Sequence, residues 1–339
     1  MIVGGGLTTK RKCLRSVFGH IPVRPAYTCT SQVASGANSL KGKPMRGRAK
    51  GERSMLQAYF RTFRKAGIVL LCALFCGLTI PAAQTSADPA PIRTNAEAAA
   101  LIDVKSGRII YEKNGDKPMK IASLTKIMTA IVAIENGDLS DMVEVSANAA
   151  GKEGSSIYLK PGDTMSLHNL LYGLMLRSGN DAATAIAEHV GGSVEGFVYL
   201  MNEKAQMIGL TGTQFKNPHG LDEEGHYSTA KDLAKLTAYA LRNPVFQEIV
   251  KTKTKTTPSP DGKGNYYWYN KNKMLSIFDG ADGVKTGYTK LAKRCLVSSA
   301  TRNGQQLAAV TLNDPDDWAD HAKLLNYGFG HYPLGEIVR

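Results

Sequence analysis

Cysteine is scarce in this chain of 339 residues, and only one of its five cysteines, Cys295, lies after residue 87. A single cysteine cannot form an internal disulfide, so the sequence predicts a domain that is stable without one. Neither C-x-x-C nor H-E-x-x-H occurs, so we expect no metal and no cofactor. His219 and His226 are predicted to form hydrogen bonds within loops. Cys295 begins an apolar stretch, and we expect it in the core.

Acidic residues are nearly absent from the first 65 residues, which contain 14 Lys and Arg but only one acid, Glu52. This segment accounts for the whole net charge of +13, because the other 274 residues contain 28 basic and 28 acidic side chains. A nucleic-acid-binding domain carries its basic footprint on the folded part. The sequence therefore argues against a nucleic-acid partner. The 43% hydrophobic content argues against disorder of the bulk.

The hydrophobic run at residues 66–80 is 15 residues long, shorter than the roughly 20 residues that a membrane-spanning helix needs. Basic residues precede it, and a proline and small residues follow it, which is the order found in secretory signal peptides. We therefore predict a signal peptide at 55–87, cleaved after Ala83 or Ala87, and export to the cell envelope or beyond. The alternative is an uncleaved anchor, and only then do we expect membrane contact.

Residues 1–54 precede this signal and show no hydrophobic periodicity. Two interpretations remain open. The segment is either a real basic leader, disordered, or an extension upstream of a true start at Met55 or Met45.

In the remaining chain, segments with strand patterns and segments with helical patterns form separate groups. Residues 97–104 and 108–113 flank a glycine turn and predict a β-hairpin. Helical periodicity then predicts a cluster of helices at 123–135, 166–177, 181–190, 194–208 and 229–242. Strand-like segments follow at 266–269, 283–287, 294–301 and 306–312, before a last helix at 318–329. This order predicts an α+β fold, an antiparallel sheet packed with helices, in one domain at 88–332 with a tail at 333–339.

The first chemical motif is Ser123-Leu124-Thr125-Lys126 at the start of a strongly apolar helix. Residues three apart share a helical face, and the helix N-terminus favours negative charge on the Ser123 oxygen. Lys126 lies within the apolar run 121–134, so we expect a lowered pKa that lets it accept the Ser123 proton. The alternative is an N-cap serine with a solvated lysine.

Two further motifs follow. Ser178-Gly179-Asn180 lies in a break between helices, 52 residues after Lys126, and Lys285-Thr286-Gly287 lies on a strand, 105 residues after Asn180. Taken alone, the first could be an ordinary turn and the second a surface strand. The three motifs together, in this order, resemble the S-x-x-K, S-D-N and K-T-G signature of penicillin-binding proteins and class A β-lactamases. Gly179 stands where class A β-lactamases place an aspartate, so the resemblance points to the penicillin-binding proteins.

On these motifs, and on the segments ASLTKIMTA, LMLRSGNDAA, FKNPHGLDEEGHYSTAKDLA and DGADGVKTGYT, the chain resembles the serine D-alanyl-D-alanine carboxypeptidases over about residues 95–332. These are the low-molecular-mass penicillin-binding proteins. The resemblance implies the β-lactamase/penicillin-binding fold. It also implies removal of the terminal D-Ala from pentapeptide stems of peptidoglycan, and covalent binding of β-lactams.

The resemblance also implies catalytic roles. Ser123 would be the nucleophile that becomes acylated, and Lys126 its general base. Ser178 would line the cleft and relay a proton, and Asn180 would hold Lys126 and the substrate amide.

For substrate binding, the resemblance implies that Lys285 and Thr286 hold the terminal carboxylate, next to Gly287. The oxyanion hole would consist of the backbone N–H groups of Ser123 and Tyr288. Both sets of roles are expectations at this point.

The sequence departs from the family in two places. Members often place an arginine on or just before the last helix to bind the carboxylate, but residues 313–329 contain no arginine and four aspartates. Arg294 is then a candidate helper. Many members also continue into a β-rich C-terminal domain and an amphipathic helix, which we do not expect here because the chain stops at Arg339.

Two rival functions remain open. A β-lactamase is disfavoured because no E-x-x-L-N motif precedes the Lys285 motif. The other is a non-catalytic β-lactam sensor or scaffold on the same fold, which the complete motif set disfavours. Carboxypeptidase and endopeptidase activity are not separated by the sequence.

Overall fold

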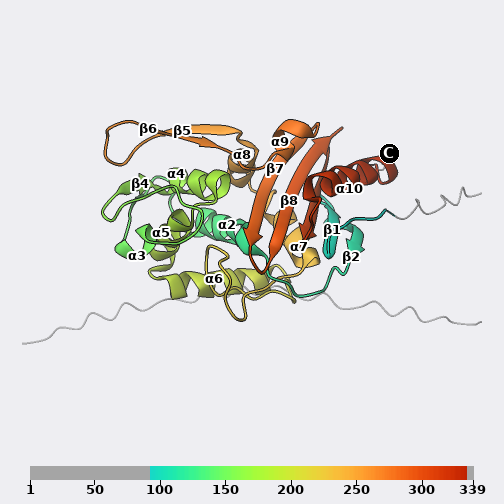
Figure 1. Cartoon of the computed structure of the whole chain (residues 1–339), viewed down its shortest axis with the longest axis horizontal. Coiled ribbons are helices and arrows are strands. Elements are labelled where there is room, and N and C mark those ends of the chain that lie inside the picture. The colour runs from blue at the N-terminus through green and yellow to red at the C-terminus, as the bar shows by residue number, and fades with distance from the viewer. Residues whose placement is uncertain (1–91, 334–339) are drawn as a thin grey trace, which may run out of the picture. The chain divides into compact units, whose positions relative to one another are not determined.

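The computed structural model of this protein describes residues 92–333. The predicted leader and signal peptide, residues 1–87, lie outside the described residues, as does most of the predicted tail, so the predicted domain boundaries stay predictions. A five-stranded antiparallel sheet in the order β2-β1-β9-β8-β7 forms the centre (Figure 1). Its strands are β1 (Ala98–Asp103), β2 (Ile109–Lys113), β7 (Ala281–Thr289), β8 (Lys293–Arg302) and β9 (Gln305–Leu312).

The predicted α+β fold is confirmed, because the N-terminal hairpin pairs with strands from the other end of the chain. Residue Ala99 lies opposite Lys113 within the hairpin and opposite Thr311 of β9. The turn between β8 and β9 is the predicted Asn303-Gly304, with positive φ angles of 48° and 76°. Such angles are what a two-residue hairpin turn requires. Strand β7 is left at one edge of the sheet.

Helices cover both faces of the sheet, which is why every residue of β1 is buried. Leu101 packs with Leu324 and Leu325 under the last helix. Its neighbours Ala100 and Ile102 belong to the larger core on the opposite face, because side chains alternate along a strand. The helices are α2 (Lys126–Asn136), α3 (Ala147–Ala150), α4 (Leu167–Tyr172), α5 (Asn180–Gly191), α6 (Val194–Met207), α7 (Ala230–Ala240), α8 (Pro244–Lys251), α9 (Met274–Ile277) and α10 (Asp317–His331).

Helices α2 to α6 form the second half of the molecule, beside β7 (Figure 1). Helix α2 lies at its centre, with every residue from Lys126 to Ala133 buried. A 3-10 turn, η1 (Ala122–Thr125), precedes it, so the predicted helix does not begin at Ser123 as a regular α-helix. The predicted helix at 166–177 likewise ends as a π-helical turn, η2 (Gly173–Arg177). Thr229 caps α7 as predicted, since its Oγ accepts from the Asp232 N–H.

The small strands lie apart from the main sheet. The predicted strand at 266–269 does not join the central sheet. It forms β6 (Asn265–Tyr269) and pairs only with β5 (Thr254–Pro258). A second small ribbon pairs β3 (Met142–Glu144) with β4 (Thr164–Ser166).

The loop at residues 217–220 packs against the start of α2. Its turn closes through a 2.7 Å hydrogen bond from the Gly220 N–H to Asn217 Oδ1. Gly220 has a φ of +87°, and a Cβ there would collide with the Ala122 carbonyl. Only glycine satisfies both the φ angle and this close approach.

We expect Gly220→Ala to lower the free energy of unfolding by about 2–5 kcal/mol, because a strained φ angle and overpacking add. The matched control is Gly262→Ala, where φ is +67° and no atom lies within 4 Å of an added Cβ. This control should lose only about 1–2 kcal/mol. Urea unfolding at constant m-value measures both. Equal losses in the two variants would contradict the contact with Ala122.

Candidate active site

The side chain of Lys126 lies at the meeting point of three segments. Its Nζ lies 3.2 Å from Ser123 Oγ and donates hydrogen bonds to Asn180 Oδ1 at 2.6 Å and to the His219 carbonyl at 2.5 Å. The side chain is fully buried. Ser123 lies in η1 and Lys126 opens α2, so the two share a helical face despite the 3-10 geometry. The solvated lysine of the alternative interpretation is therefore excluded.

Burial is the main cause that lowers the pKa of Lys126 well below its usual value. The positive charges of Lys285 and Lys271 lower it further, while Asp181 opposes them. Burial disfavours the charged form of an amine that has no paired carboxylate. The site therefore favours a neutral amine beside the Ser123 hydroxyl.

The break between η2 and α5 supplies Ser178 and Asn180. Ser178 ends η2 in the left-handed region, at φ 67°, and its side chain is 4% exposed. Asn180 Nδ2 donates to the Glu153 carbonyl at 2.6 Å, which turns its Oδ1 toward Lys126. The break is thus more than a surface turn, because it directs polar groups into the buried side of the site.

Asp181 holds the neighbouring loop in place. Its buried carboxylate accepts hydrogen bonds from the Ile157 and Leu159 N–H groups at 3.1 Å and from Ser156 Oγ at 2.6 Å. These bonds fix the loop that carries Ser155 beside Ser178. Asp181, the residue that follows the Ser178-Gly179-Asn180 motif, therefore has a structural function that the sequence did not reveal.

His226 supports the backbone before Ser123, as expected of a loop histidine that forms hydrogen bonds. Its Nδ1 accepts from the Lys216 N–H at 3.0 Å, so the proton of the neutral ring lies on Nε2, which faces Thr125 Oγ at 2.8 Å. Thr125 donates onward to the Ala122 carbonyl at 2.9 Å. Burial lowers the pKa of His226 to about 4, which keeps the ring neutral. This series of hydrogen bonds fixes the backbone of Ala122, whose φ is 48°.

Lys285 on β7 is buried rather than part of a surface strand. It is 1% exposed, and its Nζ donates to the Thr286 carbonyl at 2.8 Å. Burial, with a smaller effect of the charge on Lys271, lowers the pKa of Lys285 to about 7. Lys271 itself donates to Ser155 Oγ at 3.0 Å. No motif in the sequence indicated Lys271, which follows β6 in a turn rich in Asn and Lys.

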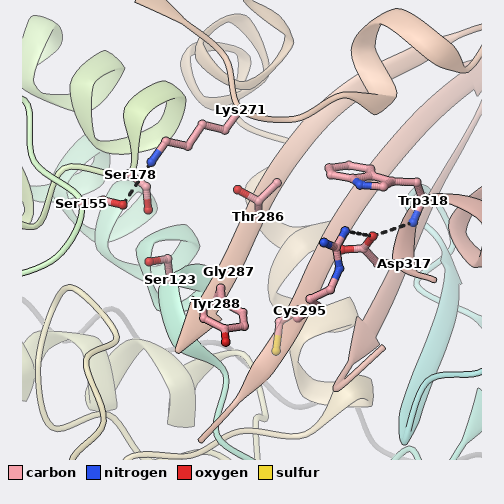
Figure 2. A pocket seen from close by; sticks show the side chains of 11 residues that line it. Ser123, Ser155, Ser178, Lys271, Thr286, Gly287, Tyr288, Cys295, Asp317 and Trp318 are labelled. Carbon is pink, nitrogen blue, oxygen red and sulfur yellow. Dashed lines mark hydrogen bonds and ion pairs between the residues drawn. The ribbon is translucent and has the colours of Figure 1, made fainter. Parts of the chain in front are cut away.

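These groups surround a pocket of about 350 Å³. Figure 2 shows Ser123 and Ser178 on one side of Thr286, and Trp318 and Asp317 on the other. The pocket is lined by Ser123, Ser155, Ser178, Lys271, Thr286, Gly287, Tyr288, Arg294, Cys295, Asp317 and Trp318. The other three predicted site residues, Lys126, Asn180 and Lys285, lie buried behind this lining.

Strand β7 passes close to η1, which brings two of the three motifs together. A Cβ on Gly287 would lie 3.2 Å from the Ser123 backbone nitrogen and 3.3 Å from the Ile121 carbonyl oxygen. Glycine at this position lets the edge strand approach the turn that carries Ser123. The backbone of Tyr288 follows directly along the pocket wall.

Cys295 borders the pocket, but its thiol is buried and disfavours the reactive thiolate form. The side chain is 1% exposed, and burial raises the pKa of the thiol to about 12. Its prediction as a core residue is confirmed. In residues 92–333, no group of three or more His, Cys, Asp or Glu is arranged to hold a metal ion. Within the same residues, no helix is long and apolar enough to cross a bilayer.

The antiparallel sheet packed with helices is a fold of the penicillin-binding and DD-peptidase type. A model of the D-alanyl-D-alanine carboxypeptidase family matches residues 83–316. The chain therefore belongs to the D-alanyl-D-alanine carboxypeptidase family.

The chain is similar to several proteins named D-alanyl-D-alanine carboxypeptidase. The chain is 38% identical to the D-alanyl-D-alanine carboxypeptidase DacF of Bacillus subtilis over 72% of its own length and 64% of that protein. It is 38% identical to DacC of Escherichia coli over 76% of its own length and 66% of that protein. The chain thus spans just under two thirds of the length of these relatives.

Solved structures show the same fold. A Streptomyces DD-transpeptidase is 34% identical and superimposes with a TM-score of 0.68, covering 71% of this chain and 99% of the other. The carboxypeptidase DacD of Francisella tularensis is also 34% identical, with a TM-score of 0.67 and coverage of 72% of both chains.

The lowered pKa of Lys285 makes stability depend on pH. In the unfolded chain the amine titrates near 10.5, and in the folded chain near 7. Between these values the unfolded state binds more protons, so the free energy of unfolding rises with pH. Below about pH 7 both states are protonated and this contribution is constant. Lys126 acts in the same direction because its pKa is also lowered.

We expect the wild-type protein to gain more stability between pH 7 and 9 than Lys285→Met does. The difference in slope can reach about 1.4 kcal/mol per pH unit for one group. Urea unfolding at three pH values measures it. Lys290→Met, on the exposed turn after β7, is the control and should keep the wild-type slope. Identical slopes in wild type and Lys285→Met would contradict a neutralised Lys285.

Proposed function

We propose that this protein is a serine-type D-alanyl-D-alanine carboxypeptidase that forms an acyl-enzyme on Ser123. Membership of the carboxypeptidase family supports the reaction class. The observation that carries the mechanism is the fully buried Lys126 amine, 3.2 Å from Ser123 Oγ, with a lowered pKa. The substrate is the pentapeptide stem of peptidoglycan, which ends in two D-Ala residues.

In the first step, neutral Lys126 accepts the Ser123 proton. Its two N–H bonds point to Asn180 Oδ1 and the His219 carbonyl, which leaves the lone pair for the hydroxyl. The Ser123 oxygen then attacks the carbonyl carbon of the penultimate D-Ala. The backbone N–H groups of Ser123 and Tyr288 stabilise the oxyanion, and one such donor typically contributes about 10²–10³ in rate.

In the second step, the amide bond breaks. Lys126 returns the proton to the nitrogen of the terminal D-Ala, directly or through Ser178, and D-Ala leaves as a free amine. Water then enters, loses a proton to Lys126 and attacks the Ser123 ester, and Lys126 passes that proton to Ser123 Oγ as the ester bond breaks. The enzyme returns to its starting state with one amide bond hydrolysed.

Lys285 and Thr286 position the substrate through its terminal carboxylate. Lys285 is half-protonated near neutral pH, because its pKa lies at about 7. A bound carboxylate favours the charged form. Its charge also keeps Lys126 neutral, since Lys285 is one of the causes of the lowered pKa there.

The same acylation accounts for the proposed covalent binding of β-lactams, because their strained amide presents a carbonyl to Ser123 and a carboxylate to Lys285. The two rival functions make different predictions for this complex. A β-lactamase would hydrolyse nitrocefin with rapid turnover. A non-catalytic sensor would become labelled but release no D-Ala from a peptide.

We expect Ser123→Ala to abolish both D-Ala release from diacetyl-L-Lys-D-Ala-D-Ala and labelling by fluorescent penicillin. Lys126→Arg should also fail, because a guanidinium stays protonated and cannot accept the serine proton. Urea unfolding checks that both variants are folded.

The controls are Ser106→Ala in the exposed β1–β2 turn and Lys235→Arg on α7, which should keep wild-type activity. If Lys126→Arg were labelled at the wild-type rate, Lys126 would act as a fixed charge and not as the base.

We also propose that the protein is exported and that residues 55–87 are removed as a signal peptide. The family acts on the cell wall, outside the cytoplasm, which fits the basic and then apolar order of this segment. N-terminal sequencing of the exported form should begin at Gln84 or Asp88. A mature chain that begins before Arg61 would contradict cleavage and favour an anchor.

A further inference from the structure

A second pocket, which shares no lining residue with the pocket at Ser123, lies beside helix α7. Its volume is about 370 Å³, which is in the range of small-molecule sites. Four of its residues follow the spacing of one helical face along α7 and just beyond its end, Lys235, Ala238, Tyr239 and Arg242. The others come from the β1–β2 hairpin and the end of α6 (Figure 1). The proposed hydrolysis uses none of these residues.

The inner part of this pocket is apolar. Ile102 and Ala238, which both line it, are 1% and 3% exposed. The hydroxyl of Tyr239 donates to Glu135 Oε1 at 2.8 Å, so the aromatic ring is what Tyr239 offers to the pocket. Met207 is exposed, and its flexible thioether can adapt to the shape of a bound group. These surfaces suit an aliphatic chain.

Arg242 supplies a fixed cation to the same pocket. Its Nη2 donates to the carbonyls of Val104 at 3.2 Å and Lys105 at 3.4 Å, which ties the guanidinium to the β1–β2 turn. Within residues 92–333, its Nε and Nη1 donate to no partner. A guanidinium held in this way presents the remaining donors to a carboxylate or a phosphate group.

Lys235 supplies a second cation that is weakly paired. In the described part of the chain, the one acid within 4.0 Å of its Nζ is Asp232, whose Oδ1 lies 3.8 Å away, beyond hydrogen-bond range. The other oxygen of Asp232 accepts hydrogen bonds from the Gly212 N–H at 2.7 Å and from Thr213 Oγ1 at 2.9 Å. No acid is among the described residues that line the pocket. Its charge is therefore positive.

We propose that the pocket beside α7 binds an anionic amphiphile, with a phosphate or carboxylate headgroup at Arg242 and Lys235 and an aliphatic chain over Ile102 and Ala238. A sugar or a nucleobase requires neutral donors and acceptors, which the described side chains that line this pocket do not offer. A free anion would leave the apolar part uncovered, and an uncharged chain would leave both cations unpaired. A phospholipid of a membrane and a free single-chain lipid share this chemistry.

The first test is isothermal titration calorimetry of the purified protein with octyl phosphate, octanol and inorganic phosphate. Octanol retains the chain without the charge, and inorganic phosphate retains the charge without the chain. We expect octyl phosphate to bind at least about tenfold more tightly than either, because it uses both the apolar part and the cations. Added salt should weaken its binding, since it screens the exposed charges.

Lys235→Gln and Arg242→Gln should each weaken the binding of octyl phosphate about three- to fivefold, the effect of a solvent-exposed charge contact. The matched control is Lys271→Gln, which removes the same charge from the pocket at Ser123 and should keep the wild-type affinity. Met207→Ser should weaken the binding of octyl phosphate but not that of inorganic phosphate. Because Lys235 donates no hydrogen bond to the described residues, Lys235→Gln decides the case even if Arg242→Gln does not fold.

Sedimentation with vesicles identifies the source of the amphiphile. Binding to phosphatidylglycerol vesicles but not to phosphatidylcholine vesicles, reduced by Lys235→Gln, would assign the pocket to a membrane phospholipid. Binding of octyl phosphate without binding to vesicles would assign it to a free single-chain lipid.

Three results would overturn the inference. Equal affinities for octyl phosphate and octanol would remove the role of the cations, and equal affinities for octyl phosphate and inorganic phosphate would remove that of the apolar part. A loss of affinity in Lys271→Gln without one in Lys235→Gln would place the ligand at Ser123 instead. None of these measurements depends on the release of D-Ala, so the proposed function is tested separately.

Discussion

The burial of one uncharged amine organises this molecule. Lys126 lies at the start of a helix whose first eight residues are all buried, where a charged ammonium would cost several kcal/mol without a partner. Its hydrogen bonds come from Asn180, at the start of another helix, and from the carbonyl of His219, in a distant loop. Each partner depends on further bonds, to Glu153 in one case and within the Asn217–Gly220 turn in the other. The starts of α2 and α5 and the loop at residues 217–220 thus meet at this amine.

The sheet places a further charged group near Lys126. Strand β7 is an edge strand, and Gly287 lets it approach the backbone of Ser123 closely. The strand thereby brings Lys285 within electrostatic range of Lys126, and Lys271 adds a further positive charge beside this amine. Lys285 and Lys271 lower the pKa of Lys126, and Lys271 lowers the pKa of Lys285. In the proposed mechanism, the same cluster keeps Lys126 neutral and attracts the substrate carboxylate, so acid-base chemistry and substrate binding would be coupled.

The sequence predicted the parts of this arrangement that local patterns encode. Apolar periodicity located α2, and the spacing of Ser123 and Lys126 placed both on one face. It could not predict the 3-10 turn at Ala122–Thr125 or the π-helical turn at Gly173–Arg177, because a shift of backbone hydrogen bonding leaves no composition signal. The run of four aromatics in β6 indicated a strand but not its partner β5. Lys271 and Asp181 were missed because their roles arise only from contacts distant in sequence.

The start of the last helix is acidic and lacks the arginine that the family pattern places there. In the structure, Asp317 pairs with Arg294 from strand β8. Among the described side chains that line the pocket, Asp317 is the one acid, and the Arg294 guanidinium bonded to it offsets its charge. The pocket therefore keeps the positive character that Lys271 gives it, although residues 313–329 contain four aspartates and no arginine.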